Sequence, residues 1–350
     1  MNGPRASGAL TDEAVGQVPV EPISEVPGPA LATLTRERFT NANWLFERKL
    51  DGMRVLAERS RDGVILRSRN GAAAGASFPE IVEALAAQHT PDFVVDGEVV
   101  AFDGAQTSFA GLQPRMHVSD AAKARRSGVE VFYYVFDLLH LDGHSARALA
   151  LRDRKDLLRE LFDWRDPLRF TEHRNADGEA YFREACAKGW EGIIAKRAAA
   201  PYKPGRTRDW LKFKCEQGQE FVIGGWTDPQ GSRLGFGALL LGYFDETTAL
   251  VYAGRVGTGF DRAMLASLHK RLVALERRSP AYDESTLPRA AASRAGVHGA
   301  ISGVIHWATP ELVAQVSFAE WTRDGQLRHP RFVGLREDKA ARDVVRETPA

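Results

Sequence analysis

The stretch from Glu47 to Arg54, which reads ERKLDGMR, constrains this chain more than any other feature. It places Lys49 two residues before an Asp-Gly pair, a common turn signal between antiparallel strands. A lone lysine near such a turn is usually a solvated charge. A lysine held in a pocket can instead attack a phosphorus atom and carry a nucleotide covalently. The downstream segments decide between the two interpretations, because nucleotidyl transfer also needs acidic, aromatic and basic groups.

Length and composition indicate a two-domain globular protein. The chain has 350 residues and a hydrophobic content of 44%, enough for two cores. Its formal net charge is only +1, so binding to a polyanion must depend on local clusters such as that between Lys203 and Lys214. No signal sequence opens the chain, and its longest apolar run, around Ala238 to Leu241, is too short for a bilayer. We therefore expect no membrane insertion.

The two cysteines, Cys186 and Cys215, are far apart and form no C-x-x-C or Cys/His cluster. Neither a disulfide framework nor a zinc site is expected from this spacing. Such cysteine usage is typical of a reducing cytoplasm.

The fold class expected for the first domain, residues 29–216, is mixed α+β. Residues 1–28 are rich in Gly, Pro and Ala and are expected to form a flexible leader. Turn signals at Asp51-Gly52 and Asp62-Gly63 favour an antiparallel meander between Trp44 and Arg69. Further strands are expected over Asp92 to Phe102, Val131 to Leu139, Gly192 to Arg197 and Trp210 to Cys215, and helices over Pro79 to His89, Leu151 to Phe162 and Gly178 to Lys188.

A second domain is expected over residues 217–340, after a boundary at Gln217 to Gln219. It has short strand patterns and one long helix pattern from Asp261 to Arg278, which suits a small closed β-barrel of the OB type. Arg289 to Gly299 is expected to be an exposed loop. Residues 341–350 are expected to form a tail.

Lys49 needs a lowered pKa to act as a nucleophile, because a lysine ammonium is unreactive at neutral pH. Lys212, Lys214 and Arg54 are the cations that we expect to lower it. Arg54 lies beyond the Asp51-Gly52 turn and can return to the same pocket. In isolation, a surface pair between Arg54 and Asp51 is an equally good interpretation.

Two acidic residues lie inside an apolar run at Asp96-Gly97-Glu98, where burial requires a partner. A divalent cation or a ribose hydroxyl is such a partner; exposed acids at a hairpin edge are the alternative. Glu191 opens another hydrophobic strand and is a second candidate for metal binding. Arg69, in Ser68-Arg69-Asn70-Gly71, offers a guanidinium that suits a phosphate.

The strand from Phe132 to Leu139 is rich in aromatic residues, which more often fill a core than bind a ligand. If Phe136 faces the pocket, it can stack on a purine. In Trp210-Leu211-Lys212-Phe213-Lys214 the alternation places both lysines on one face of a strand. A triphosphate between them would neutralise their repulsion.

The stretch from Arg336 to Lys339, which reads REDK, looks like a charged terminal segment when it is taken alone. It becomes a candidate because a pyrophosphate leaving group requires added positive charge, which a mobile domain can deliver. Gly254 to Gly259 resembles a glycine loop but lacks the dinucleotide-binding pattern.

Taken together, K-x-D-G-x-R, S-R-N-G, D-G-E, Y-Y-V-F-D, E-G-I-I-A-K-R, W-L-K-F-K and R-E-D-K resemble the ordered motifs of ATP-dependent DNA ligases, over about residues 29 to 340. The similarity is greatest to the bacterial end-joining type, the ligase D and ligase C group. It implies a covalent nucleotidyltransferase (adenylation) domain followed by an OB-fold, ATP as cofactor, and Mg²⁺ or Mn²⁺. Lys49 would take AMP from ATP, AMP would pass to a 5′-phosphate, and a 3′-hydroxyl would displace it.

The resemblance also implies roles for the nucleotide pocket. Glu47 would read the adenine amino group, Phe136 would stack on the base and Arg54 would contact ribose. Arg69 and Arg206 would bind nucleotide as well.

Further implied roles concern phosphate and metal. Glu98 and Glu191 would serve ribose and the divalent metal, and Lys212 with Lys214 would meet the α-phosphate. Arg336, Asp338 and Lys339 would act in the first step.

Implied partners are duplex DNA with a nick or ends, a Ku-type end-binding protein and a separate repair polymerase, for a monomeric enzyme of the bacterial cytoplasm associated with the nucleoid. Two rival interpretations stay open. One is an RNA ligase or a capping guanylyltransferase, which shares the lysine motif. The other is a nucleic-acid-binding protein that has lost turnover.

Overall fold

The computed structural model describes residues 20, 28–90, 92–116, 118–215, 217–229, 233–287 and 304–348. The expected leader, apart from Val20 and Gly28, and the expected loop from Arg289 to Gly299 lie outside the described residues. The chain separates into two compact units between Cys215 and Glu216, and each is described by itself. The boundary expected from the sequence lay at Gln217 to Gln219.

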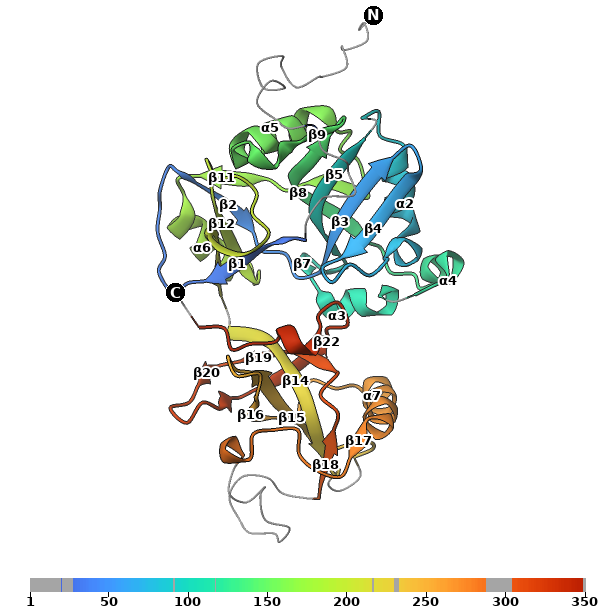
Figure 1. The fold of residues 1–350 in the computed structure, drawn as a ribbon, viewed down its shortest axis with the longest axis vertical. Helices are drawn as coiled ribbons and strands as arrows, with labels where there is room; N and C mark the ends of the chain where they lie inside the picture. Colours follow the sequence, from blue (N-terminus) through green and yellow to red (C-terminus); the bar gives the residue numbers. More distant parts are fainter. Residues whose placement is uncertain are drawn as a thin grey trace, which may run out of the picture. The chain divides into compact units, whose positions relative to one another are not determined.

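Two sheets form the framework of the first unit (Figure 1). One has the strand order β10-β8-β5-β3-β4, with β9 beside β8, and the other has the order β1-β13-β12-β2-β11. The strands are β1 Ala30–Leu34, β2 Trp44–Arg48, β3 Met53–Ser60, β4 Gly63–Ser68, β5 Phe93–Val100, β6 Phe102–Asp103, β7 Gln106–Thr107, β8 Phe132–Leu141, β9 His144–Ser145, β10 Leu168–Phe170, β11 His173–Asn175, β12 Gly192–Arg197 and β13 Gly205–Lys214. The β10–β8 and β1–β13 pairs are parallel.

Helices complete the first unit, and the periodicity predicted three of them, over about residues 79–89, 151–162 and 178–188. The two short helices between residues 109 and 126 were not predicted. The helices are α2 Pro79–Ala86, α3 Phe109–Leu112, α4 Ala121–Arg126, α5 Leu151–Leu161 and α6 Gly178–Ala187. Proline at the first turn starts α2, and its buried Ile81 and Leu85 pack with Val95 and Val135 of the β10–β4 sheet in the larger core. A smaller core joins α6 to the second sheet.

The segment Asp51-Gly52 is not the hairpin turn that the sequence predicted. It connects β2 of one sheet to β3 of the other. Gly52 is required there by close approach, because a Cβ atom would lie 2.2 Å from the Val99 carbonyl oxygen. Glycine signals a turn and a tight crossing equally well, so local sequence did not separate them. Asp62-Gly63 does form the predicted hairpin turn between β3 and β4.

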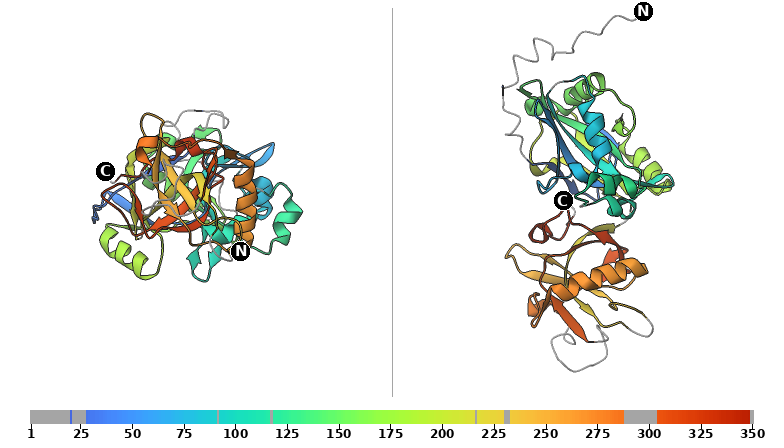
Figure 2. Two further views of the ribbon diagram at one scale, coloured as in Figure 1. Left: turned by 90° about the horizontal axis from the view of Figure 1, so that it is seen from below. Right: turned by 90° about the vertical axis from the view of Figure 1, so that its right-hand side faces the viewer.

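The second unit is a curved antiparallel sheet with one helix along its side (Figure 2). Its elements are β14 Gln217–Thr227, β15 Leu239–Phe244, β16 Leu250–Val256, α7 Arg262–Ala274, β17 Glu276–Arg277, β18 Ile305–Ala308, β19 Val313–Phe318, β20 Glu320–Trp321, β21 Leu327–Arg328 and β22 Arg331–Leu335. The long strand β14 pairs with β15, β18 and β19, and Leu268 and Leu272 of α7 pack on the core that these strands enclose.

Two expectations for the second unit are corrected. The predicted helix from Asp261 to Arg278 ends at Ala274, because β17 pairs with β18 directly after it. The predicted tail packs on the unit: Val344 is fully buried and its carbonyl accepts a hydrogen bond from the Phe244 amide at 2.8 Å. No helix among the described residues is long and apolar enough to cross a membrane.

His306 forms a charged contact that connects β17, β18 and the segment after β14. Its Nδ1 lies 2.7 Å from Glu276 and its Nε2 lies 2.8 Å from Asp228. Partial burial lowers the pKa of His306, but the two carboxylates outweigh this effect and raise the pKa above 6.5.

We expect His306→Gln to destabilise the protein only at acidic pH. A raised folded-state pKa gives stability that is complete below the unfolded pKa, near 6.5, and is lost as pH rises through the folded value. Because the groups are partly exposed, the loss should be about 1 kcal/mol or less. The measurement is the difference in Tm between wild type and variant from pH 5 to 9. A constant difference would contradict the assignment.

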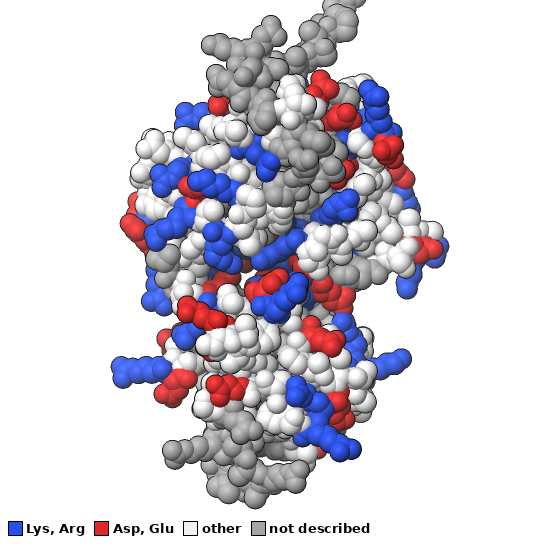
Figure 3. Space-filling view, viewed as in Figure 1, with Lys and Arg blue, Asp and Glu red and all other residues white. Residues whose placement is uncertain are grey.

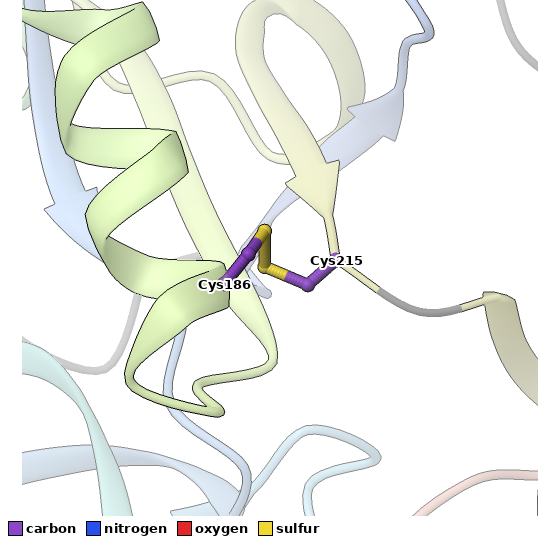
Figure 4. The surroundings of a disulfide bond; sticks show 2 residues. All are labelled: Cys186 and Cys215. Atoms are coloured by element: carbon purple, nitrogen blue, oxygen red, sulfur yellow. A yellow bond between two sulfur atoms is a disulfide. The ribbon is translucent and has the colours of Figure 1, made fainter.

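A disulfide joins Cys186 and Cys215, contrary to the expectation from their spacing (Figure 4). Cys186 lies in the last turn of α6 and Cys215 directly follows β13, and the fold brings their Cα atoms to 5.3 Å. The Cys215 amide also donates to the Glu191 carbonyl at 3.0 Å. Tertiary packing therefore pairs two thiols that lie 29 residues apart, which local sequence did not reveal.

We expect Cys186→Ser to lower the stability of the oxidised protein by about 3 kcal/mol, since the bond closes a loop of moderate length. Denaturation with and without a thiol reductant measures this effect. The reductant should destabilise wild type and leave the variant unchanged. An equal response of the two proteins would show that the bond adds nothing to stability.

Candidate active site

Lys49 directly follows β2 and is fixed by the start of β12. Its backbone amide donates to the Gly192 carbonyl at 2.9 Å. Gly192 has φ +145°, and a Cβ atom there would lie 1.9 Å from the Phe213 carbonyl oxygen, so only glycine fits. The side chain of the preceding Glu191 then lies beside Lys49, with Oε2 2.5 Å from Nζ. Two predicted site residues thus meet in one ion pair.

The pKa of Lys49 is raised, whereas the sequence argument required it to be lowered. Burial lowers the pKa, but the Glu191 carboxylate outweighs burial, and Asp51 and Glu98 add to its effect. The cations that the sequence predicted, Lys212, Lys214 and Arg54, are therefore not the groups that determine the pKa of the Lys49 amine in this state. The predicted attack of Lys49 on phosphorus would require Glu191 to release the ammonium first.

Arg54 pairs with Asp96 and not with Asp51. Its Nε and Nη2 donate to the two Asp96 oxygens at 2.5 and 2.6 Å, and Tyr202 donates to the same carboxylate at 2.7 Å. This arrangement satisfies the fully buried Asp96. Burial lowers the pKa of Arg54, but the contact with Asp96 raises it overall. Glu98, opposite Arg54 on the next strand, is half-buried.

Glu47 lies between two buried lysines that the sequence argument missed. Lys155 of α5 and Lys196 of β12 place their ammonium groups 2.6 and 2.5 Å from its two oxygens. Burial raises the pKa of Glu47, and the two lysines together lower it below its usual value. Burial also lowers the pKa of Lys196 to about 8. The position of Lys155 between Leu151 and Leu158, on the buried face of a helix, was a signal that could have been read.

Phe136 is buried beside these charges. Its ring packs edge to face with Trp210, and the Lys196 ammonium and the Arg54 guanidinium lie 4.1 and 4.5 Å from its centroid. These are cation–π distances. The ring therefore lies among the groups predicted to hold a nucleotide, with cations against it.

Lys212 and Lys214 are half-buried on β13, and Leu211 and Phe213, which alternate with them, enter the core, as the alternation predicted. Lys214 pairs in register with Gly192, whose carbonyl binds the Lys49 amide.

The other two predicted arginines of the first unit lie on different strands. Arg69 is half-buried directly after β4. Arg206 is exposed on β13 and donates to the Ala32 carbonyl at 2.7 Å.

Arg336, Asp338 and Lys339 lie after β22 in the second unit. Arg336 donates twice to Asp338, at 2.9 and 2.8 Å, and Asp338 is fully buried. Lys339 pairs with Glu220 at 3.0 Å. The segment is thus an ordered part of its unit. The interpretation of these residues as a simple charged terminal segment is wrong.

Glu191 pairs with Lys49, and Glu98 lies close to Gly52, three residues after Lys49, because a Cβ atom on Gly52 would be 3.1 Å from the Glu98 Cγ. Among the described residues, no three His, Cys, Asp or Glu side chains gather in a metal-binding group. Two carboxylates fit Mg²⁺ or Mn²⁺, because Mg²⁺ is commonly held by one or two carboxylates, waters and phosphate oxygens of the substrate. The donor set therefore fits a metal that arrives with a nucleotide.

Comparisons with known proteins agree with this geometry. Residues 29–214 match the family model described as ATP dependent DNA ligase domain, and residues 232–339 match the ATP dependent DNA ligase C terminal region. The chain is 38% identical over 334 residues to the multifunctional non-homologous end joining protein LigD of Pseudomonas aeruginosa, covering 94% of this chain and 38% of that protein.

LigD of Mycobacterium tuberculosis is likewise 38% identical over 326 residues, covering 91% of this chain and 40% of that protein. A solved mycobacterial DNA ligase D complexed with ATP and MES matches with a TM-score of 0.62 and 35% identity, covering 91% of this chain and 98% of that one.

The chain belongs to the ATP-dependent DNA ligase family. The predicted fold class, an adenylation domain followed by an OB-fold, is confirmed. The chain spans about two fifths of the length of the LigD relatives that it matches.

Proposed function

We propose that the chain is an ATP-dependent DNA ligase that seals nicks or joined ends through a lysyl-AMP and a 5′-adenylated DNA intermediate, in repair by non-homologous end joining. The observation that carries the proposal is Lys49, half-buried and held beside Glu191, in a chain of this family. The end-joining role is supported by the printed names of the LigD relatives.

In the first step, Lys49 attacks the α-phosphorus of ATP as a neutral amine. A nitrogen–phosphorus bond forms, the bond to the β-phosphate oxygen breaks, and pyrophosphate leaves. Glu191 releases the ammonium before the attack, when Lys49 loses one proton to solvent, and the attacking nitrogen loses a second proton to solvent as its bond to phosphorus forms. Lys212 and Lys214 would stabilise the negative charge that develops on the α-phosphate.

A divalent metal, Mg²⁺ or Mn²⁺, would be held by Glu191 and Glu98 and would neutralise phosphate charge. Glu47 and Lys196 offer an acceptor and a donor side by side, which suits the edge of an adenine base. Phe136, Arg54, Arg69 and Arg206 would complete the nucleotide site.

Arg336, Asp338 and Lys339 would serve the same step from the second unit. A movement of the two units about residues 214–219 would then let DNA enter. We place the enzyme in the bacterial cytoplasm at the nucleoid, acting as a monomer with a Ku-type protein and a separate polymerase.

Labelled nucleotides test the proposal directly. Incubation with α-labelled ATP should label the protein, and α-labelled GTP should not, which separates a ligase from a guanylyltransferase. The labelled protein should then seal a nicked DNA duplex in preference to a nicked RNA duplex. Labelling without sealing of either duplex would contradict ligase activity, and absence of labelling would contradict the covalent mechanism.

A further inference from the structure

A pocket of about 320 Å³ opens at the edge strand β10 of the first unit. Three aromatic and three arginine side chains dominate its lining: Tyr134, Trp164, Phe170, Arg159, Arg165 and Arg169. Aromatic rings that stack on bases, combined with cations that follow the backbone, are typical of sites for a polynucleotide strand. None of these residues belongs to the predicted nucleotide site.

A row of polar side chains connects this pocket to the active site. Arg54, Glu98, Tyr134 and Arg169 lie opposite one another on β3, β5, β8 and β10. Residues paired in this way project from the same face of a sheet. All four are half-buried, and Arg169 donates to the Tyr134 hydroxyl at 2.9 Å. The pocket therefore lies at the end of a row that includes Glu98, which acts on Lys49.

Two arginines of the pocket, Arg159 and Arg165, form only exposed pairs that a ligand can displace, whereas Arg169 is held by Asp166 and Tyr134. Arg159 pairs with Glu172 at 2.7 Å, and these side chains are 49% and 74% exposed. Such a surface pair contributes little, so a phosphate can displace the carboxylate. Arg165 is 80% exposed and its contact with Asp163 is 3.5 Å long.

The aromatic side chains of the pocket are fixed by their neighbours. Trp164 is half-buried, its Nε1 donates to the Arg159 carbonyl at 3.1 Å, and its ring packs edge to face on Phe170 with centroids 5.6 Å apart. A ring held in this way loses little freedom when a base stacks on it. The formal net charge is only +1, and basic and acidic side chains are interspersed on the face shown in Figure 3. Binding of a polyanion therefore depends on local clusters of this kind.

The geometry points to this pocket as a subsite for one polynucleotide strand, with a base against Trp164 and backbone phosphates on Arg159 and Arg165. The assignment rests on the proposed function, because the strand is the one whose phosphate reacts near Lys49. Binding sites for proteins and peptides are also rich in aromatic and arginine side chains, so a peptide is the alternative ligand of this pocket. The strand is favoured because the row from the pocket leads to the reacting lysine.

Two variants with opposite expected effects on DNA binding test the subsite, and each has a matched control. Arg159→Ala removes a phosphate contact, and Glu172→Gln removes the carboxylate that competes for Arg159. The matched controls are Arg125→Ala and Glu83→Gln, because Arg125 and Glu83 form a comparable pair, 47% and 67% exposed, between α4 and α2. Each control changes the net charge as its partner variant does. Binding of the adenylated protein to nicked DNA is measured by fluorescence anisotropy over a range of salt concentrations.

We expect Arg159→Ala to weaken binding roughly fivefold near 0.15 M salt and to reduce the salt slope by about one. Glu172→Gln should strengthen binding roughly two- to fivefold. Misfolding would weaken DNA binding, so it cannot explain an increase in affinity. The controls should differ from wild type by less than either test variant.

If Arg159→Ala and Glu172→Gln bind as their controls do, the subsite is overturned, and the pocket is left for a protein partner. Every variant is also incubated with α-labelled ATP. Covalent labelling of the protein then tests the proposed function separately from the DNA subsite. Failure of labelling in wild type contradicts the proposed function, whereas normal labelling with unchanged DNA binding contradicts the subsite alone.

Discussion

Lys49→Ala will abolish the covalent nucleotide adduct while the protein remains folded. Its amine is the proposed nucleophile, and alanine offers no atom that can form the nitrogen–phosphorus bond. Intact-mass measurement after incubation with ATP and a divalent metal should show the mass of one AMP on wild type and none on the variant. Adding pyrophosphate should remove the adduct from wild type, because the step is reversible.

Two further variants make the result specific. Lys49→Arg keeps a cation beside Glu191 but presents a guanidinium that does not lose its proton, so it should be folded and unlabelled. Lys188→Ala removes an exposed lysine that also pairs with a glutamate, Glu184, at 2.6 Å, and it should be labelled like wild type. An adduct on Lys49→Ala or Lys49→Arg would assign the nucleophile to another lysine, with the buried Lys196 the first to examine.

Local sequence patterns predicted the elements that hold the site. Alternation of Leu211 and Phe213 with Lys212 and Lys214 gave both the strand and its two faces, since side chains alternate along a strand. The helix α5 was likewise expected from its apolar spacing. These features depend on neighbours in the chain, so the sequence contains the information needed to find them.

The pairing of charges was not predictable in the same way. Glu47 meets Lys155 and Lys196, which lie more than a hundred residues away in sequence, and Arg54 meets Asp96 on another strand. Cys186 and Cys215 meet because α6 ends beside the end of β13. Each contact depends on how separate elements pack, and no periodicity within one element specifies its partner.

The pKa of Lys49 shows how these unpredicted contacts affect the candidate active site. The sequence indicated cations on neighbouring motifs, and a lowered pKa followed from them. In the folded chain the carboxylates of Glu191, Asp51 and Glu98 act on the amine and raise its pKa. The sequence motifs contain both the expected cations and these carboxylates, but the sign of their combined effect on the amine depends on distances that only the structure provides.

Asp137→Asn is expected to destabilise the first unit strongly. Asp137 on β8 and Arg154 on α5 are both fully buried, with Arg154 Nε and Nη2 at 2.7 and 2.9 Å from the two carboxylate oxygens. Asparagine leaves the guanidinium buried without a counter-charge, which costs about 3–5 kcal/mol. Thermal or urea denaturation of the purified variant measures the loss.

The matched control is Asp166→Asn, which breaks a pair of the same geometry at the surface. Arg169 Nε and Nη2 donate to Asp166 at 2.6 and 3.0 Å, but Asp166 is 61% exposed. Water reaches both side chains, since Arg169 is 33% exposed, so the loss should be about 1 kcal/mol or less. Adding Arg154→Met to Asp137→Asn should recover part of the stability, because it removes the stranded charge. Equal losses at the buried and exposed pairs would contradict burial as the cause.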